Sequence, residues 1–215
     1  MTQDEQSKLN DCLAGAANRG DTVKIEALLA TGADVHVGDD GALRLAAEHG
    51  HTETVRVLLA SGAYVHAVDD DALRWASHHG HTEIVQALLA FGANVHAMDD
   101  YALCSAAMTG HTETVKVLLA SGANVHAADD RLLYWVAQNG HTETLRVLQE
   151  ALKNEIADRL ELERQQNPLS VGTGLTLAKS GPEDLDALLR EAIAEQSSPE
   201  RPDGGEYASL PLCPR

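Results

Sequence analysis

Residues 69–81, with the sequence DDDALRWASHHGH, concentrate side chains that could do chemistry. They supply three carboxylates, one indole and three imidazoles within a single short stretch. Imidazole nitrogens and carboxylate oxygens bind zinc and other transition metals, and they are also common general acids and bases. The stretch therefore poses a choice between a metal or catalytic site and a structural role that recurs along the chain.

The same residue types return at a period of 30. The tetrapeptide Gly-His-Thr-Glu begins at residues 50, 80, 110 and 140, and Gly20-Asp21-Thr22 is a degenerate first copy. Each full copy except the last continues with an apolar run, a turn containing Gly-Ala, a Val-His pair and an aspartate pair. Such self-similarity predicts a repeat protein, in which stacked units bury a core that no single unit could form.

Each unit is expected to contain two short helices. Val55, Leu58 and Leu59 lie at i, i+3 and i+4, and Gly62 follows where a helix often ends in the left-handed conformation. The other helix is expected over about residues 70–79. One aspartate per unit directly precedes that helix, which favours a role as its N-cap. These aspartates are Asp40, Asp70, Asp100 and Asp130.

The segment GHTETVRVLLASGAYVHA, residues 50–67, resembles the second helix, the Gly-Ala turn and the hairpin start of an ankyrin repeat. The resemblance covers roughly residues 8–150. The period is shorter than the usual 33 or so residues, and Gly41-Ala42-Leu43-Arg44 replaces the family's Thr-Pro-Leu-His. The resemblance implies an all-α repeat solenoid, an ankyrin-type stack of about five helix-turn-helix units with short hairpin loops, plus a C-terminal helical extension.

The expected organisation has three parts, which are the solenoid at 1–150, a helical extension or C-terminal cap at 151–196, and a disordered tail at 197–215. The units are expected at about residues 5–35, 36–65, 66–95, 96–125 and 126–150.

Both ends of an open stack need a cap. At the front, Ser7 to Arg19 is expected to form the first helix. At the back, apolar spacing continues through Leu160 and predicts a long helix over about residues 142–165, ended by Asn167-Pro168. A further helix is expected to open at Ser180. The two helices are expected to seal the last unit, or alternatively to associate with another chain.

Most histidines fall at repeated positions, which favours turn and ladder hydrogen bonds. The turn histidines are His51, His81, His111 and His141, and the hairpin histidines are His36, His66, His96 and His126. Stacked units lie about 10 Å apart, whereas metal-bound nitrogens lie about 2 Å from a shared ion. The sequence therefore predicts no metal. Metal-dependent activity through His78, His79 and the aspartates is the alternative that elemental analysis would test.

The four full units differ mainly on one face of the first helix. The variable positions are at helical offsets 0, 4, 7 and 8, which share a stripe, and the positions between them stay apolar. In the ankyrin family this stripe and the hairpin tips form a concave binding groove, and the resemblance implies a protein partner here. The predicted partner-binding residues are His49, Trp75, His78, His79, Met98, Tyr101, Met108, Arg131, Trp135 and Gln138.

The formal net charge of −17 disfavours binding to nucleic acid or to an anionic membrane. No apolar run is long enough to span a membrane, no signal peptide is evident, and three cysteines give no disulfide framework. A cytoplasmic protein is expected, and delivery to another cell is left open. The aspartate pairs suit either helix capping or a basic partner, so an acidic inhibitor or decoy of a basic nucleic-acid-binding protein is the alternative function.

No catalytic motif is complete. The sequence Gly172-Thr173-Gly174 lacks the Gly-Lys-Ser/Thr ending of a phosphate loop. Neither Ser77 nor Ser105 has an ordered histidine and carboxylate partner visible in the sequence. The chain is therefore predicted to be non-enzymatic and to need no cofactor.

Overall fold

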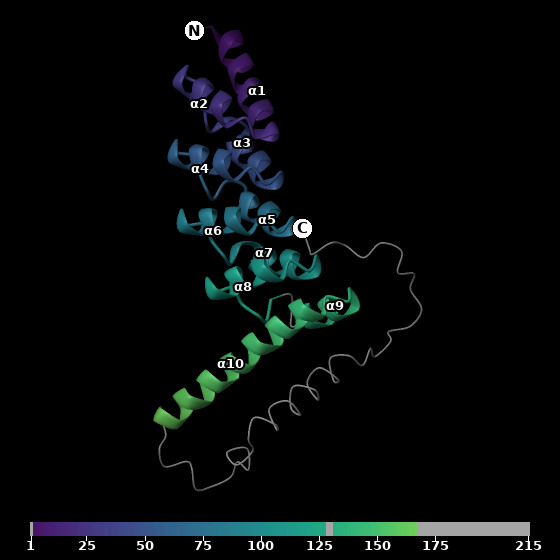
Figure 1. Cartoon of the computed structure of the whole chain (residues 1–215). Coiled ribbons are helices and arrows are strands. Elements are labelled where there is room, and N and C mark those ends of the chain that lie inside the picture. Colours follow the sequence, from purple (N-terminus) through teal and green to yellow (C-terminus); the bar gives the residue numbers. More distant parts are fainter. Residues whose placement is uncertain (1, 128–130, 167–215) are drawn as a thin grey trace, which may run out of the picture.

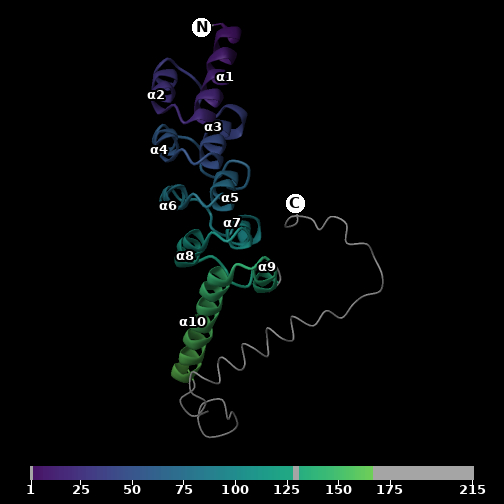
Figure 2. The ribbon, with the colours of Figure 1, turned by 45° about the vertical axis from the view of Figure 1, so that its right-hand side comes forward.

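The computed structural model describes residues 2–127 and 131–166, which form ten helices and no strand. The helices alternate between two columns (Figure 1), with α3, α5, α7 and α9 following α1 in one column and α2, α4, α6 and α8 beside them. A rotated view shows the same two columns, with α10 projecting from the last unit (Figure 2). The predicted all-α repeat solenoid is confirmed.

Each unit contributes one helix to each column. The first helices are α1 (Gln3–Arg19), α3 (Val37–Glu48), α5 (Asp71–His78), α7 (Ala97–Met108) and α9 (Leu132–Gln138). The second helices are α2 (Thr22–Ala30), α4 (Thr52–Ala60), α6 (Thr82–Ala90), α8 (Thr112–Ala120) and α10 (Thr142–Gln166).

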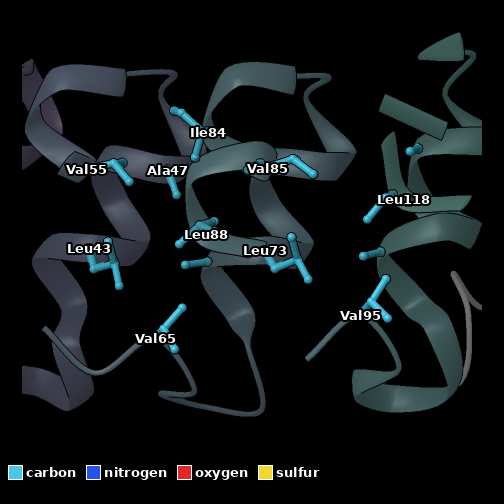
Figure 3. Packing of buried hydrophobic residues seen from close by; sticks show 14 of the residues in the cluster. Leu43, Ala47, Val55, Val65, Leu73, Ile84, Val85, Leu88, Val95 and Leu118 are labelled. Carbon is cyan, nitrogen blue, oxygen red and sulfur yellow. The ribbon is translucent and has the colours of Figure 1, made fainter. Parts of the chain in front are cut away.

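The core lies between the columns and is built from Leu, Val, Ile and Ala. Leu43 and Leu73 of the first helices are 1% exposed, and Val55 and Val85 of the second helices are fully buried. Figure 3 shows these side chains between successive units, with Val65 of a loop closing the core from below. Small side chains allow the helices to approach closely, so each unit covers the apolar face of its neighbour.

The turn histidines link each unit to the preceding one. Their Nε2 atoms donate to backbone carbonyl oxygens at the end of the preceding unit's first helix or at its cap. The pairs are His51 with Asn18 at 3.1 Å, His81 with Glu48 at 3.1 Å, and His141 with Met108 at 3.0 Å. The predicted turn hydrogen bonds are confirmed for these three residues.

Threonine hydroxyls form a second set of contacts between units. The Oγ1 atoms of successive second helices lie within hydrogen-bonding distance at three of the four junctions. The pairs are Thr22 with Thr54 at 2.9 Å, Thr82 with Thr114 at 2.9 Å, and Thr112 with Thr144 at 2.7 Å. At the α4–α6 junction the buried Ile84 takes the threonine position, so apolar packing replaces the hydroxyl pair.

The aspartates predicted to be N-caps have another role. Asp70 has a left-handed backbone conformation with φ 61°, and its carboxylate makes no capping hydrogen bond. Its Oδ1 accepts a hydrogen bond from the Asn94 N–H of the next unit at 2.8 Å and lies 3.1 Å from Nδ1 of His66. Equivalent contacts are made by Asp40 and Asp100. The N-cap prediction is wrong for these three residues, and Asp130 lies outside the described residues.

The hairpin histidines also differ from expectation. Nδ1 of His36, His66 and His96 pairs with the aspartate four residues later in the same unit, and does not extend a ladder between units. In α3 and α7 this aspartate is the last of three left-handed residues that interrupt the start of the helix, so these stretches resemble the loop before α5. Nε2 of His126 lies 3.5 Å from a carboxylate oxygen of Glu155 in α10.

The front helix begins earlier than predicted. α1 starts at Gln3 instead of Ser7, because Thr2 and Glu5 form a reciprocal capping box. At the back, α10 confirms the predicted long helix and passes residue 150 without a break. Ala128, the aspartates at 129–130, the helix expected from Ser180 and the tail at 197–215 lie outside the described residues. None of the described helices has the length and apolar content needed to cross a membrane.

Candidate partner-binding surface

The ten predicted partner-binding residues all belong to the first helices or to the turns beside them, and none is fully buried. Five are exposed, namely His49, His79, Met98, Arg131 and Gln138, and five are half-buried, namely Trp75, His78, Tyr101, Met108 and Trp135. We call the surface formed by these ten residues the variable face. Their accessibility is compatible with contact to a partner.

A buried carboxylate organises the centre of the variable face. Asp71, which is 3% exposed, accepts hydrogen bonds from Nε of Arg74 at 2.7 Å and from Nε1 of Trp75 at 3.2 Å. Nη1 of Arg44, from the preceding unit, lies 3.1 Å from the same carboxylate. The Arg74 guanidinium is 4.7 Å from the Trp75 ring centroid and 5.6 Å from that of Tyr101. These contacts hold the indole in one orientation.

Two histidines complete the aromatic cluster. The rings of Trp75 and His79 are stacked with centroids 5.9 Å apart, and His78 meets His79 edge-on at 4.9 Å. Nδ1 of His78 is 3.0 Å from Oγ of Ser105 in α7. The structure therefore brings Trp75, His78 and His79 together and links them through Arg74 to the next unit. We call the group formed by Asp71, Arg74, Trp75, His78, His79 and Tyr101 the central cluster.

Burial is the main cause that lowers the pKa of His78, and electrostatic repulsion from His79, His111 and Arg74 acts in the same direction. Burial also lowers the pKa of His81, although its hydrogen bond to the Glu48 carbonyl opposes the change. Both imidazoles are consequently neutral near pH 7, so their ring nitrogens are available for hydrogen bonds without a full positive charge.

The other predicted residues are spread along the stack. Trp135 occupies in α9 the position that Trp75 occupies in α5, two units earlier, and Gln138 lies one turn further along α9. Met98 is 44% exposed and, with φ 52°, is the first of three left-handed residues that interrupt the start of α7. The ten residues of the variable face are thus distributed over four units.

Sequence reasoning did not predict how this surface is held together. The pairing of Asp71 with Arg44 joins two units, and spacing alone did not reveal it. It also did not single out Tyr64 and Phe91, in the turns after α4 and α6, which are 56% and 52% exposed. Both stand where the other units have polar residues, so the comparison among units that found Trp75 could have found them.

Within the described residues, no group of three histidine, cysteine or acidic side chains is placed to hold a metal ion. A hollow of about 330 Å³ lies between the loop after α8 and α10, away from the central cluster. Its lining residues are Leu119, Gly122, Ala123, Asn124, Val125, Ala151 and Glu155.

Comparison with known families explains this architecture. A model of the single ankyrin repeat matches residues 41–70, and a model of three ankyrin copies matches residues 64–129. The repeats over residues 41–129 are ankyrin repeats. A search of curated proteins found no match to the chain. Ankyrin repeats are generally protein–protein interaction modules.

Proposed function

We propose that the chain is a non-enzymatic interaction protein that binds a protein partner on the variable face. The observation that carries the proposal is the central cluster, in which Asp71 and Arg74 fix the accessible ring of Trp75. A side chain that is already held in one rotamer loses little conformational entropy on binding. Aromatic and arginine side chains also dominate the energetics of many protein interfaces.

The charge of this surface supports a partner that is recognised mainly by apolar contacts and hydrogen bonds. Arg44 and Arg74 neutralise the buried Asp71, and Arg131 adds an exposed positive charge near Trp135. The variable face is thus less acidic than the chain as a whole, which has a formal net charge of −17. Partner recognition there does not require a basic protein.

The test compares partner capture by two triple variants of the full chain. Trp75→Ala/His79→Ala/Trp135→Ala removes aromatic groups from the variable face and is expected to abolish recovery of the partner that wild type captures. Arg56→Ala/Gln86→Ala/Lys116→Ala is the matched control, because these residues are exposed at equivalent positions of α4, α6 and α8. Urea unfolding verifies that both variants keep the fold. Undiminished recovery by the first variant would place the binding site elsewhere.

One observation favours a second function, an acidic inhibitor or decoy of a basic protein. In each of three loops the first aspartate of the pair is exposed, whereas the second is buried and hydrogen-bonded. The exposed residues are Asp39, Asp69 and Asp99. Under this alternative, replacing all three with asparagine weakens partner binding, and raising the salt concentration weakens wild-type binding in the same way. Binding that is insensitive to both changes rejects it.

A further inference from the structure

The fifth unit exposes the surface through which each earlier unit contacts its successor. Ala137 of α9 is exposed, whereas the equivalent Ala47 and Ala107 are fully buried. Leu145 of α10 is half-buried, whereas the equivalent Val115 is fully buried. The residues that would face a sixth unit are therefore apolar and open.

Two further positions of this surface, which contact the next unit in earlier repeats, also lack such a contact among the described residues. A Cβ built on Gly110 would lie 2.5 Å from the imidazole of His141, whereas a Cβ on Gly140 meets no described atom within 4 Å. Thr112 shares a hydrogen bond with Thr144 of the next unit, whereas its equivalent Thr142 is exposed. We call the surface formed by Ala137, Gly140, Thr142 and Leu145 the end face.

A second copy of the chain is a poor occupant of the end face. In the first unit, Asp21 stands where later units have the turn histidine, and Lys24 stands where the second, fourth and fifth units have a buried threonine. Both residues are exposed at the front of the stack. Head-to-tail association would place Asp21 against Gly140 and Lys24 against Thr142, which would replace an imidazole and a hydroxyl with two charges.

The chain itself carries a sequence similar to a unit beyond α10. Residues 185–189, LDALL, match residues 25–29, IEALL, of α2, and a glycine precedes each stretch by four or five positions. Residues 175–178, LTLA, match residues 43–46, LRLA, of α3. Sequences similar to those of both helices of a unit therefore recur there in the same order.

The linker is long enough for this segment to return to the end face. Leu152 is the last α10 residue packed against the core, and the helix continues from there to residue 166, a rise of about 21 Å. Residues 167–174 can span about 27 Å when extended. The chain can thus run back along the projecting part of α10.

We propose that residues 175–193 cover the end face as a degenerate sixth unit. The test is hydrogen exchange on the full chain, read from peptides covering residues 132–152. Leu185→Ser/Leu188→Ser/Leu189→Ser is expected to raise exchange of these amides at least tenfold. Leu210→Ser/Leu212→Ser, further along the chain, is the matched control and leaves exchange unchanged. Peptides from α1 report whether the stack itself stays folded.

A substitution on the end face tests the pairing from the other side. Ala137→Asp in the full chain is expected to raise the same exchange rates, and adding it to the Leu185/Leu188/Leu189 variant produces no further rise. Unchanged exchange in the segment variant, or effects that multiply in the combined variant, would overturn the proposal. Protection that grows with protein concentration would also overturn it, because it would assign the end face to a second copy.

Discussion

Neighbouring aspartates in each loop differ in what their carboxylates contact. Asp70 is 5% exposed and holds both His66 and the backbone of the next unit, whereas the carboxylate of Asp69 is exposed to solvent. Both residues have left-handed backbone conformations, with φ 61° and 54°. The strain of that conformation is therefore shared, and only the second carboxylate joins two units.

We expect Asp70→Ala to lower the free energy of unfolding by about 2 kcal/mol more than Asp69→Ala, because a charge-assisted hydrogen bond is lost. The backbone cost of placing alanine at a left-handed position is common to both variants and cancels in the comparison. Urea unfolding of the two variants measures the difference. Equal losses would mean that the carboxylate of Asp70 contributes no net stability.

One buried hydroxyl group in α5 is expected to destabilise the fold. Ser77 is fully buried, and its Oγ has no hydrogen-bond partner. The equivalent Ala47 and Ala107 are also fully buried. We expect Ser77→Ala to raise the free energy of unfolding by about 1 kcal/mol, since a desolvated hydroxyl is removed without leaving a large cavity. Chemical denaturation measures the gain, and Ser105→Ala, which removes the partner of His78, is expected to destabilise instead.

The lowered pKa of His78 predicts a loss of stability in mild acid. The unfolded chain takes up a proton near the ordinary value of 6.5, whereas the folded protein takes it up at a lower pH. The contribution of neutral His78 to the free energy of unfolding is therefore fully present above about pH 7. It is lost as the pH falls from the ordinary pKa of 6.5 to the lower pKa of the folded protein. His78→Gln, which introduces the residue found at position 138, should reduce the slope of the melting temperature against pH.

Ser105→Ala is the control for that experiment. It removes the hydroxyl beside His78 and keeps the imidazole, so the pH dependence caused by burial persists. An unchanged slope in His78→Gln would contradict the assignment to this residue.

At the scale of elements, the 30-residue period predicted the helices well because local spacing and turn glycines determine them. The long α10 also followed from continued apolar spacing. The role of the aspartates could not be predicted from local spacing. Asp70 contacts Asn94, 24 residues away, and it does so because the backbone has three successive left-handed residues, which no local pattern reveals. The same limit applies to Asp71, whose contact with Arg44 joins α3 and α5.

The candidate site was predictable to a similar extent. Differences among units identified Trp75, His78 and His79, which lie together in the structure. The same comparison marks Asp71 and Arg74 as variable positions. It did not predict that Asp71 is buried and accepts a hydrogen bond from Trp75, or that Arg74 lies over the indole ring, because burial depends on how the neighbouring unit covers the side chain. Variation indicates where a surface is, and the contacts beneath it determine which side chains are held in place.

At the scale of the whole molecule, the chain is a linear array in which each unit contacts only its neighbours. Its stability is therefore a sum of unit and junction contributions, and one weak junction can divide the array into parts that unfold separately. The junction of the third and fourth units depends on a close approach of Gly80 to His111. A Cβ on Gly80, which has φ 71°, would lie 2.4 Å from the ring of His111.

We expect Gly80→Ala to lower the free energy of unfolding by about 3 kcal/mol or more, through backbone strain and overpacking together. Gly92→Ala is the matched control, since its φ is 92° and its Cβ would meet open space. It shares the backbone strain and leaves the junction intact. We expect it to cost about 1 kcal/mol.

The two tryptophans report on opposite sides of this junction, since Trp75 belongs to the third unit and Trp135 to the fifth. Variants that retain only one of them, made with Trp135→Phe or Trp75→Phe, allow each side to be followed by fluorescence during urea unfolding. The two transitions should coincide in the parent chain and in Gly92→Ala and separate in Gly80→Ala. Coincident transitions in Gly80→Ala would show that coupling between these units does not depend on the contact between Gly80 and His111.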